Sequence, residues 1–116
     1  MALQTTELKD WICVSAPGRW DAFNFVDSKT SIDSIVASTN KLAINMSGIQ
    51  FVNLPMIQYL YKVAVTLRNK GGAMVIIGAS EKLKKQIRIF ASWDHLQFYS
   101  ADGWEKFVNT NQEGHA

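Results

Sequence analysis

The chain has 116 residues, of which 47% are hydrophobic and 19% charged, and its net charge at pH 7 is +2. This length fits one globular domain, and the small net charge gives no reason to expect nucleic acid as a partner. No apolar run is long enough to span a bilayer, and the polar N-terminal residues are unlike a secretory signal peptide. The single cysteine, Cys13, cannot form an internal disulfide, which favours a reducing cytoplasm.

The first half of the chain predicts two strands and two helices after a short N-terminal strand. Residues 11–16 and 42–47 alternate apolar and polar side chains, as half-buried strands do. The segment 23–39 between them has apolar residues near helical spacing and predicts a helix. A longer apolar stripe from Pro55 to Arg68 predicts the second helix. Pro55 is well suited to the first turn of this helix, because an N–H at that position has no carbonyl partner within the helix and its absence therefore breaks no hydrogen bond.

The region after this helix contains glycines and a continuous apolar run. Gly71 and Gly72 end the helix, and one of them is expected to be left-handed. The apolar run 73–79 is typical of a parallel strand that is covered on both faces. Ser80 then has the side chain and position of an N-cap, so we predict a helix through Phe90.

The C-terminal part predicts one more strand and one more helix. Residues 96–100 form the strand, and Ser100 or Asp102 opens the last helix. The polar segment 109–116 is expected to be a loose tail. The alternation of strands and helices predicts an α/β domain whose central strands run parallel and are linked by helical crossovers.

A search for catalytic residues finds little. The two histidines, His95 and His115, fall in a loop and in the tail, and no Cys/His pair has zinc-ligand spacing. Cys13 lies within a predicted strand and reads as a small hydrophobe, while Asp21 and Asp27 read as solvated surface acids. No glycine-rich phosphate motif is present. We therefore predict no enzyme activity, no metal and no cofactor.

Four tryptophans are many for this length. Trp104 is predicted in the core, and Trp11 and Trp93 over the ends of the sheet. Trp20 follows Arg19 in a turn and is predicted in solvent, where the pair would suit a protein interface. The alternative, that Trp20 folds back over the sheet, is equally open.

The segments 42–53 (LAINMSGIQFVN), 55–72 (PMIQYLYKVAVTLRNKGG) and 73–80 (AMVIIGAS) together resemble the STAS domain of bacterial anti-sigma factor antagonists. The turn 18–22 (GRWDA) and the helix 101–107 (ADGWEKF) fit the same family. The resemblance implies one STAS (SpoIIAA-like) domain over 1–116, with an ordered core at about 7–108. It also implies a central mixed sheet of four to five strands with interleaved helices.

The departures from the family pattern fall on its phosphorylation motif. In the family, a partner kinase phosphorylates the second hydroxyl residue of D-S-S-G. Against that motif Asn53 stands on the aspartate, Leu54 on the first serine, Pro55 on the phospho-acceptor and Met56 on the glycine. Asn45 likewise replaces the aspartate of D-L-S-G. Pro55 has no hydroxyl, so the resemblance implies that this position is not phosphorylated.

A shifted alignment is the alternative. In that case Ser47 or Thr66 would be the acceptor. Ser47 belongs to the preceding D-L-S-G-like loop, and Thr66 lies well inside the helix, so we favour the alignment on Pro55.

The loss of the acceptor implies a permanent docking surface at the start of the helix. A phosphate would add about two negative charges and oppose an apolar interface by desolvation and repulsion. We expect Met56→Glu or Leu54→Asp to abolish partner binding and to leave the fold intact. The positions expected to contact a partner are Trp20, Asp21, Asn53, Leu54, Pro55, Met56, Ile57 and Ser80.

The leading hypothesis is a protein-binding, anti-sigma factor antagonist-like regulator of transcription or stress response. It would dock on an anti-sigma factor or a related GHKL-type serine kinase in the cytoplasm. Two alternatives stay open: a scaffold component of a stress-signalling complex, and a cytoplasmic STAS subunit of a lipid or anion transport system. Neither nucleic acid nor membrane insertion is predicted, and weak homodimerisation would favour the scaffold.

Overall fold

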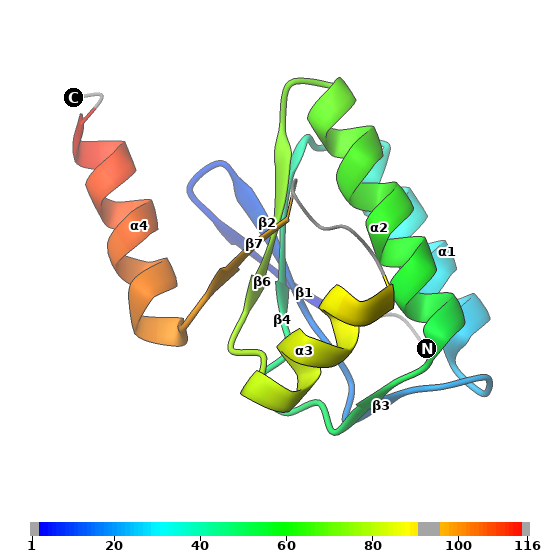
Figure 1. Ribbon diagram of the computed structural model, residues 1–116. Coiled ribbons are helices and arrows are strands. Elements are labelled where there is room, and N and C mark those ends of the chain that lie inside the picture. Colours follow the sequence, from blue (N-terminus) through cyan, green and yellow to red (C-terminus); the bar gives the residue numbers. More distant parts are fainter. Residues whose placement is uncertain (1–2, 91–95, 115–116) are drawn as a thin grey trace.

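The computed structural model describes residues 3–90 and 96–114. These residues form four helices and seven strands, arranged as Figure 1 shows. In chain order the elements are β1 (Gln4–Leu8), β2 (Trp11–Ser15), β3 (Arg19–Trp20), α1 (Phe25–Val36), β4 (Lys41–Asn45), β5 (Phe51–Val52), α2 (Leu54–Asn69), β6 (Ala73–Ile77), α3 (Glu81–Phe90), β7 (Leu96–Tyr99) and α4 (Ala101–Gly114).

The main sheet has five strands in the order β1-β2-β4-β6-β7. Strand β1 runs antiparallel to β2, and the other neighbours run parallel. This mixed sheet confirms the predicted α/β fold with parallel central strands. Helices α1, α2 and α3 lie on one face of the sheet and α4 lies on the other (Figure 1).

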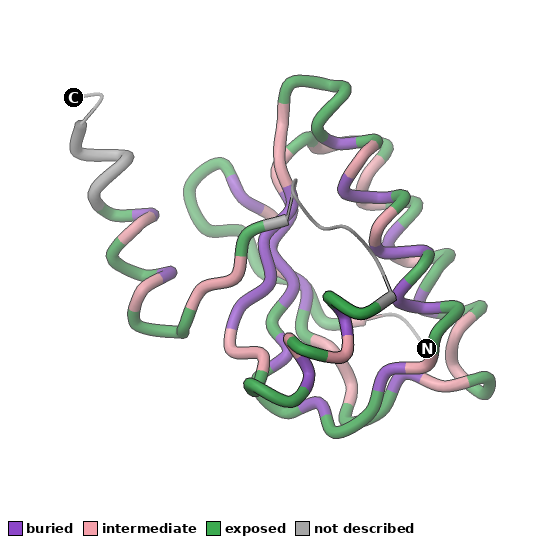
Figure 2. Tube along the Cα trace, in the orientation of Figure 1, coloured by how far each residue is buried: buried purple, intermediate pink, exposed green. Residues whose placement is uncertain are grey.

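The central strands are buried because both faces of the sheet are covered (Figure 2). Successive side chains of a strand point to opposite faces, so each strand contributes to two cores. Leu42 and Ile44 of β4 pack with the helices α1, α2 and α3. Ala43 of the same strand, with Val75 of β6, belongs to the core under α4. A continuous apolar run such as β6 is therefore explained by burial on both sides.

Aromatic side chains dominate the core beneath α4. The rings of Trp11 and Trp104 meet edge to face, with centroids 4.8 Å apart. Tyr99 and Phe107 lie beside them at a centroid distance of 5.1 Å. The predicted core position of Trp104 is confirmed, and Trp11 covers this face of the sheet. Trp93, His95 and His115 lie outside the described residues.

Helix α2 extends one residue beyond each bound of the predicted helix, Pro55 to Arg68. The side chain of Asn53 accepts a hydrogen bond from the Met56 N–H at 3.1 Å, so Asn53 is the N-cap, and Pro55 lies two residues later in the first turn. At the other end Gly71 has φ +82°. The Gly72 N–H donates back to the Leu67 carbonyl at 2.8 Å, which completes a glycine-dependent helix stop.

Serines begin the last two helices. Ser80 Oγ accepts from the Leu83 N–H at 3.1 Å, and Ser100 Oγ accepts from the Gly103 N–H at 2.9 Å. Of the two starts left open for the last helix, Ser100 is therefore the cap. Helix α4 continues to Gly114, so the loose tail expected from residue 109 is helical as far as that residue.

The segment 42–53 is not one strand, because a turn divides it. The side chain of Asn45 accepts from the Ser47 N–H at 2.9 Å, and residues 47–48 form a turn before β5. Strand β5 leaves the main sheet and pairs in parallel with β3, Arg19 opposite Phe51. This second, two-stranded sheet carries the start of α2. No helix within the described ranges is long and apolar enough to cross a membrane.

Candidate functional site

The start of α2 is held in place by the small β3–β5 sheet. The Asn53 N–H donates to the Trp20 carbonyl at 2.9 Å, immediately before the helix begins. From the other side, the Gln86 amide of α3 donates to the Val52 carbonyl at 3.2 Å. The residues that follow are thus fixed by hydrogen bonds from two elements distant in sequence.

The four apolar residues at the start of α2 separate into two exposed and two buried ones. Leu54 keeps 39% of its surface exposed, and Pro55 is also exposed. Met56 and Ile57 are fully buried in the core, so the prediction that they offer an accessible contact is wrong. Consecutive helical residues point about 100° apart, and this rotation carries Met56 and Ile57 inward.

Trp20 is also fully buried, so its predicted position in solvent is wrong. Its indole N–H donates to the hydroxyl of Ser28 in α1 at 2.8 Å, inside the protein. Of the two alternatives left open, packing against the fold is therefore the one observed. Arg19, the preceding residue of the short strand, points outward instead.

Arg19 and Phe51 form a surface pair that the sequence did not reveal. The guanidinium carbon lies 4.7 Å from the centroid of the Phe51 ring, a cation–π arrangement. Phe51 remains 36% exposed. The pair exists because β3 and β5 are neighbours, and nothing local in the sequence predicts that pairing. We call Arg19, Phe51, Leu54 and Pro55 the docking corner.

The remaining predicted contacts mainly organise the backbone. The Asp21 carboxylate lies 3.6 Å from the Arg19 side chain and accepts from the Phe23 N–H at 3.0 Å. Asn53 is half-buried as the cap of α2, and Ser80 is exposed as the cap of α3. Each of these side chains has a structural role that does not depend on a partner.

The two alternative acceptor hydroxyls are both on the surface. Ser47 is exposed in the turn after β4, close to Gly78. A Cβ added at Gly78 would come within 2.1 Å of Ser47 Oγ, and Gly78 has φ +72°, so glycine is required there. Thr66 is exposed on α2. The alignment that places Pro55 at the acceptor position stays a prediction.

Two further apolar side chains at the start of α1 are strongly exposed. Phe23 keeps 97% of its surface exposed and Val26 keeps 67%. Sequence reasoning missed both, because the helical spacing of this segment predicts which residues face inward and does not show what covers the others.

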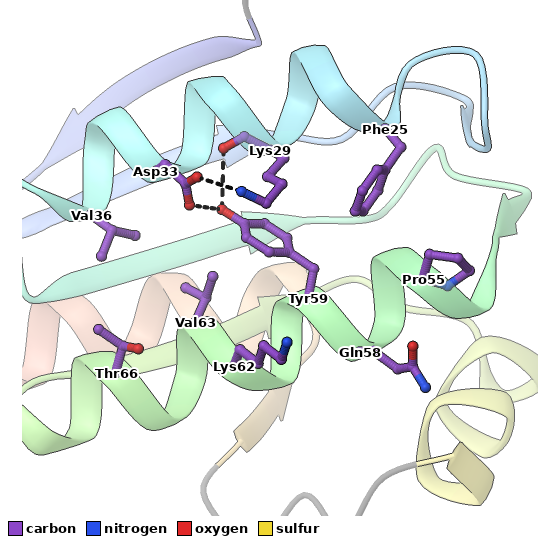
Figure 3. A pocket seen from close by; sticks show the side chains of 10 residues that line it. All are labelled: Phe25, Lys29, Asp33, Val36, Pro55, Gln58, Tyr59, Lys62, Val63 and Thr66. Carbon is purple, nitrogen blue, oxygen red and sulfur yellow. Dashed lines mark hydrogen bonds and ion pairs between the residues drawn. The ribbon is translucent and has the colours of Figure 1, made fainter.

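A groove of about 520 Å³ runs between α1 and α2 (Figure 3). At its centre the Tyr59 hydroxyl donates to Asp33 Oδ1 at 2.5 Å, and Lys29 donates to Asp33 Oδ2 at 3.0 Å. Its lining residues are Phe25, Lys29, Asp33, Val36, Pro55, Gln58, Tyr59, Lys62, Val63 and Thr66.

The contacts in this groove shift two ionisation equilibria. Burial raises the pKa of Tyr59, and the adjacent Asp33 carboxylate raises it further. Burial alone would raise the pKa of Asp33, but the hydrogen bonds from Tyr59 and Lys29 hold it below its usual value. The phenol therefore stays a donor and the carboxylate stays an acceptor at neutral pH.

The half-buried Cys13 shows no sign of activation. Burial raises the pKa of its thiol, and a hydrogen bond with Trp104 opposes this shift only partly. A raised pKa disfavours the reactive thiolate. In the described part of the chain, no three His, Cys, Asp or Glu side chains gather as a metal site would require.

The family model of the STAS domain matches residues 2–109, so the chain belongs to the STAS domain family. The fold resembles an anti-sigma-factor antagonist (STAS) domain protein from Planctomyces limnophilus, with TM-score 0.80, 14% identity, and coverage of 95% of this chain and 98% of that one. A putative anti-sigma factor antagonist from Thermotoga maritima gives TM-score 0.78 and 12% identity, with coverage of 92% and 94%.

The phosphorylated form of the Bacillus cell fate determinant SpoIIAA gives TM-score 0.71 and 11% identity, with coverage of 92% of this chain and 99% of that one. At such identities these likenesses establish the fold. A search of curated proteins gives no significant match. The resemblance inferred from the sequence is thereby confirmed at the level of family and fold.

Proposed function

We propose that this chain is a protein-binding regulator of the anti-sigma factor antagonist type. It docks on an anti-sigma factor or related serine kinase without being phosphorylated at the usual position. The observation that carries this proposal is the exposure of Leu54 and Pro55 at the start of α2. Neither side chain has a hydroxyl that could accept a phosphoryl group.

The docking corner suits a partner surface that is apolar and bears an acidic group. Phe51, Leu54 and Pro55 offer exposed apolar surface within five positions of the chain. Arg19 lies over the Phe51 ring and has a side chain that is 59% exposed, so it remains available to a carboxylate of the partner. Arginine and aromatic residues are enriched at the energetic centres of protein interfaces.

The amide of Asn53 keeps the architecture of the helix start while removing its charge. Its oxygen accepts from the Met56 N–H, as an aspartate in that position also could. An asparagine side chain is uncharged and far less basic than a carboxylate. The geometry is thus maintained without the group that would orient a phospho-acceptor or a metal ion.

Site-specific photo-crosslinking tests the proposal. With p-benzoylphenylalanine in place of Leu54, irradiation of cells of the native host should link the chain to an anti-sigma factor or serine kinase. The same replacement at Thr30, an exposed residue of α1, is the control and should give no such product. Crosslinks to a transporter subunit, or only to further STAS proteins, would favour the transport or scaffold alternative. A phosphate on residues 51–60, found by mass spectrometry of host protein, would contradict the proposal.

A further inference from the structure

We propose that the groove between α1 and α2 binds a small amphipathic monoanion, with an apolar body and one acidic group. This site is distinct from the docking corner apart from the shared residue Pro55. The inference does not depend on the proposed function, because it uses the shape, lining and charge of the groove alone.

The groove has the size and form of a ligand site. Its volume of about 520 Å³ lies within the range of about 300–1,000 Å³ that small-molecule sites occupy. In Figure 3 the lining extends from Phe25 and Pro55 at one end to Val36 and Thr66 at the other, and the Tyr59–Asp33 hydrogen bond crosses between the two helices midway. A ligand can therefore lie along the two helices on the outer side of this hydrogen bond.

The interior of the groove is apolar over most of its length. The Phe25 and Tyr59 rings meet edge to face with centroids 6.2 Å apart and form an aromatic wall. Val36 and Val63 continue this surface towards the other end. These side chains would contact the apolar body of the ligand and contribute in proportion to the area removed from water.

The charge of the lining selects an anion. Both oxygens of the Asp33 carboxylate are occupied, one by Tyr59 and the other by Lys29. Lys62 on the opposite wall forms no ion pair with the residues that the structure describes. The lining therefore carries one positive charge without a counterion, which favours a monoanion over a neutral or cationic ligand.

The orientation of the helices adds to the same preference. The beginnings of α1 and α2 lie at the same end of the groove, near Phe25 and Pro55 (Figure 3). Helix N-termini carry partial positive charge. The first turn of α2 contains no acidic residue, whereas that of α1 contains Asp27, whose carboxylate opposes the field of that helix. A carboxylate or sulfonate is thus favoured by Lys62 and by the N-terminus of α2.

Two related dyes separate the contribution of charge from that of apolar surface. The first is 1-anilinonaphthalene-8-sulfonate, an aromatic monoanion, and the second is N-phenyl-1-naphthylamine, its neutral counterpart. Fluorescence and calorimetric titration should show saturable binding of one anion per chain and several-fold weaker binding of the neutral dye. Thermal unfolding of the same samples must be cooperative, so that the dye reports on the native protein.

Variants then locate the site. Lys62→Glu should weaken binding of the anionic dye by about tenfold, corresponding to about 1.4 kcal/mol, and Lys62→Gln by less. Lys82→Glu, the same charge change on the exposed face of α3 outside the groove, should leave binding within about twofold. Thr66→Phe, which fills one end of the groove, should weaken both dyes.

Three results would overturn the inference. The first is absence of saturable binding of the anionic dye, as expected if the groove accepts only a helix of a partner protein. The second is equal affinity for the two dyes. The third is equal weakening by Lys62→Glu and Lys82→Glu, which would show an effect of net charge without a site.

Discussion

The Tyr59 hydroxyl of α2 donates to Oδ1 of Asp33 in α1 across 2.5 Å, and this hydrogen bond joins two helices that are distant in sequence. The same hydroxyl lies 3.2 Å from the Lys29 carbonyl, and the Lys29 ammonium lies 3.0 Å from the other oxygen of Asp33. The network fixes the spacing of α1 and α2, and with it the shape of the groove.

Removal of this hydroxyl should destabilise the protein. Tyr59→Phe keeps the ring and its contact with Phe25 but leaves Asp33 without its closest donor. We expect the free energy of unfolding in urea at pH 7 to fall by about 1.5–3 kcal/mol, the range for a hydrogen bond to a charged group. An unchanged urea midpoint would show that water replaces the hydroxyl without loss.

The stability difference between the wild type and Tyr59→Phe should depend on pH. The pKa of Asp33 is lowered by folding, so its contribution is present above the usual value of about 3.9 and is lost as the pH falls through the lower folded value. The pKa of Tyr59 is raised, so its contribution is present below about pH 10 and declines as the pH rises further. Urea unfolding should give a constant difference between about pH 5 and 9, shrinking on both sides. A difference that persists unchanged at pH 2–3 would contradict the role of the ionised carboxylate.

Substitutions at Leu54 and Met56, two positions apart in α2, should differ in how much they lower stability. Met56→Ala should lower the free energy of unfolding by about 2–5 kcal/mol, because its side chain is fully buried. Leu54→Ala should change it by less than about 0.5 kcal/mol. Leu54→Asp should weaken partner binding with cooperative unfolding retained. If Leu54→Asp proves as destabilising as Met56→Ala, Leu54 belongs to the core and is not part of the docking corner.

Trp20 and Ser28 should be energetically coupled. Ser28→Ala leaves the buried indole N–H without its acceptor and should cost about 1–3 kcal/mol. Trp20→Phe removes the N–H, so the second substitution should cost less on the Ser28→Ala background than on the wild type. A double-mutant cycle in urea should give a coupling of about 0.5–3 kcal/mol. Simple additivity would mean that the hydrogen bond contributes nothing to stability.

Placing the family residues at positions 53 and 55 should allow phosphorylation there. Asn53→Asp combined with Pro55→Ser supplies a carboxylate and a hydroxyl at a helix N-terminus, where a phosphate is favoured. We expect phosphate uptake from radiolabelled ATP with the cognate kinase for the double variant, and none for Asn53→Asp alone. Uptake by the wild type, mapped to Ser47 or Thr66, would show that the alignment on Pro55 is shifted.

Much of the fold could be predicted because its signals are local. Asn53 and Pro55 begin α2, and the glycine pair 71–72 ends it, through bonds that reach only a few residues along the chain. The apolar run of β6 likewise indicates burial on both faces. The order of the helices and the main-sheet strands follows from such features, whereas β3 and β5 were not predicted and the family was inferred from a resemblance of whole segments.

The candidate site was predicted only in part, because exposure is not a local property. Leu54 and Pro55 are accessible as expected, whereas Met56, Ile57 and Trp20 are buried. All of these residues are apolar, so residue type alone does not separate the exposed side chains from the buried ones. Whether each side chain is exposed or buried depends on where the β3–β5 pair directs the chain and on which helices pack nearby.

By itself, the sequence determined the α/β family fold and the absence of a hydroxyl at Leu54 and Pro55, since both follow from residue identity and short-range pattern. Only the tertiary structure decided that Arg19 lies over Phe51 and that Tyr59 meets Asp33. These pairs join residues 32 and 26 positions apart, and long-range contacts of this kind depend on the packing of the whole domain. The surface that a partner or a ligand meets is therefore a property of the fold.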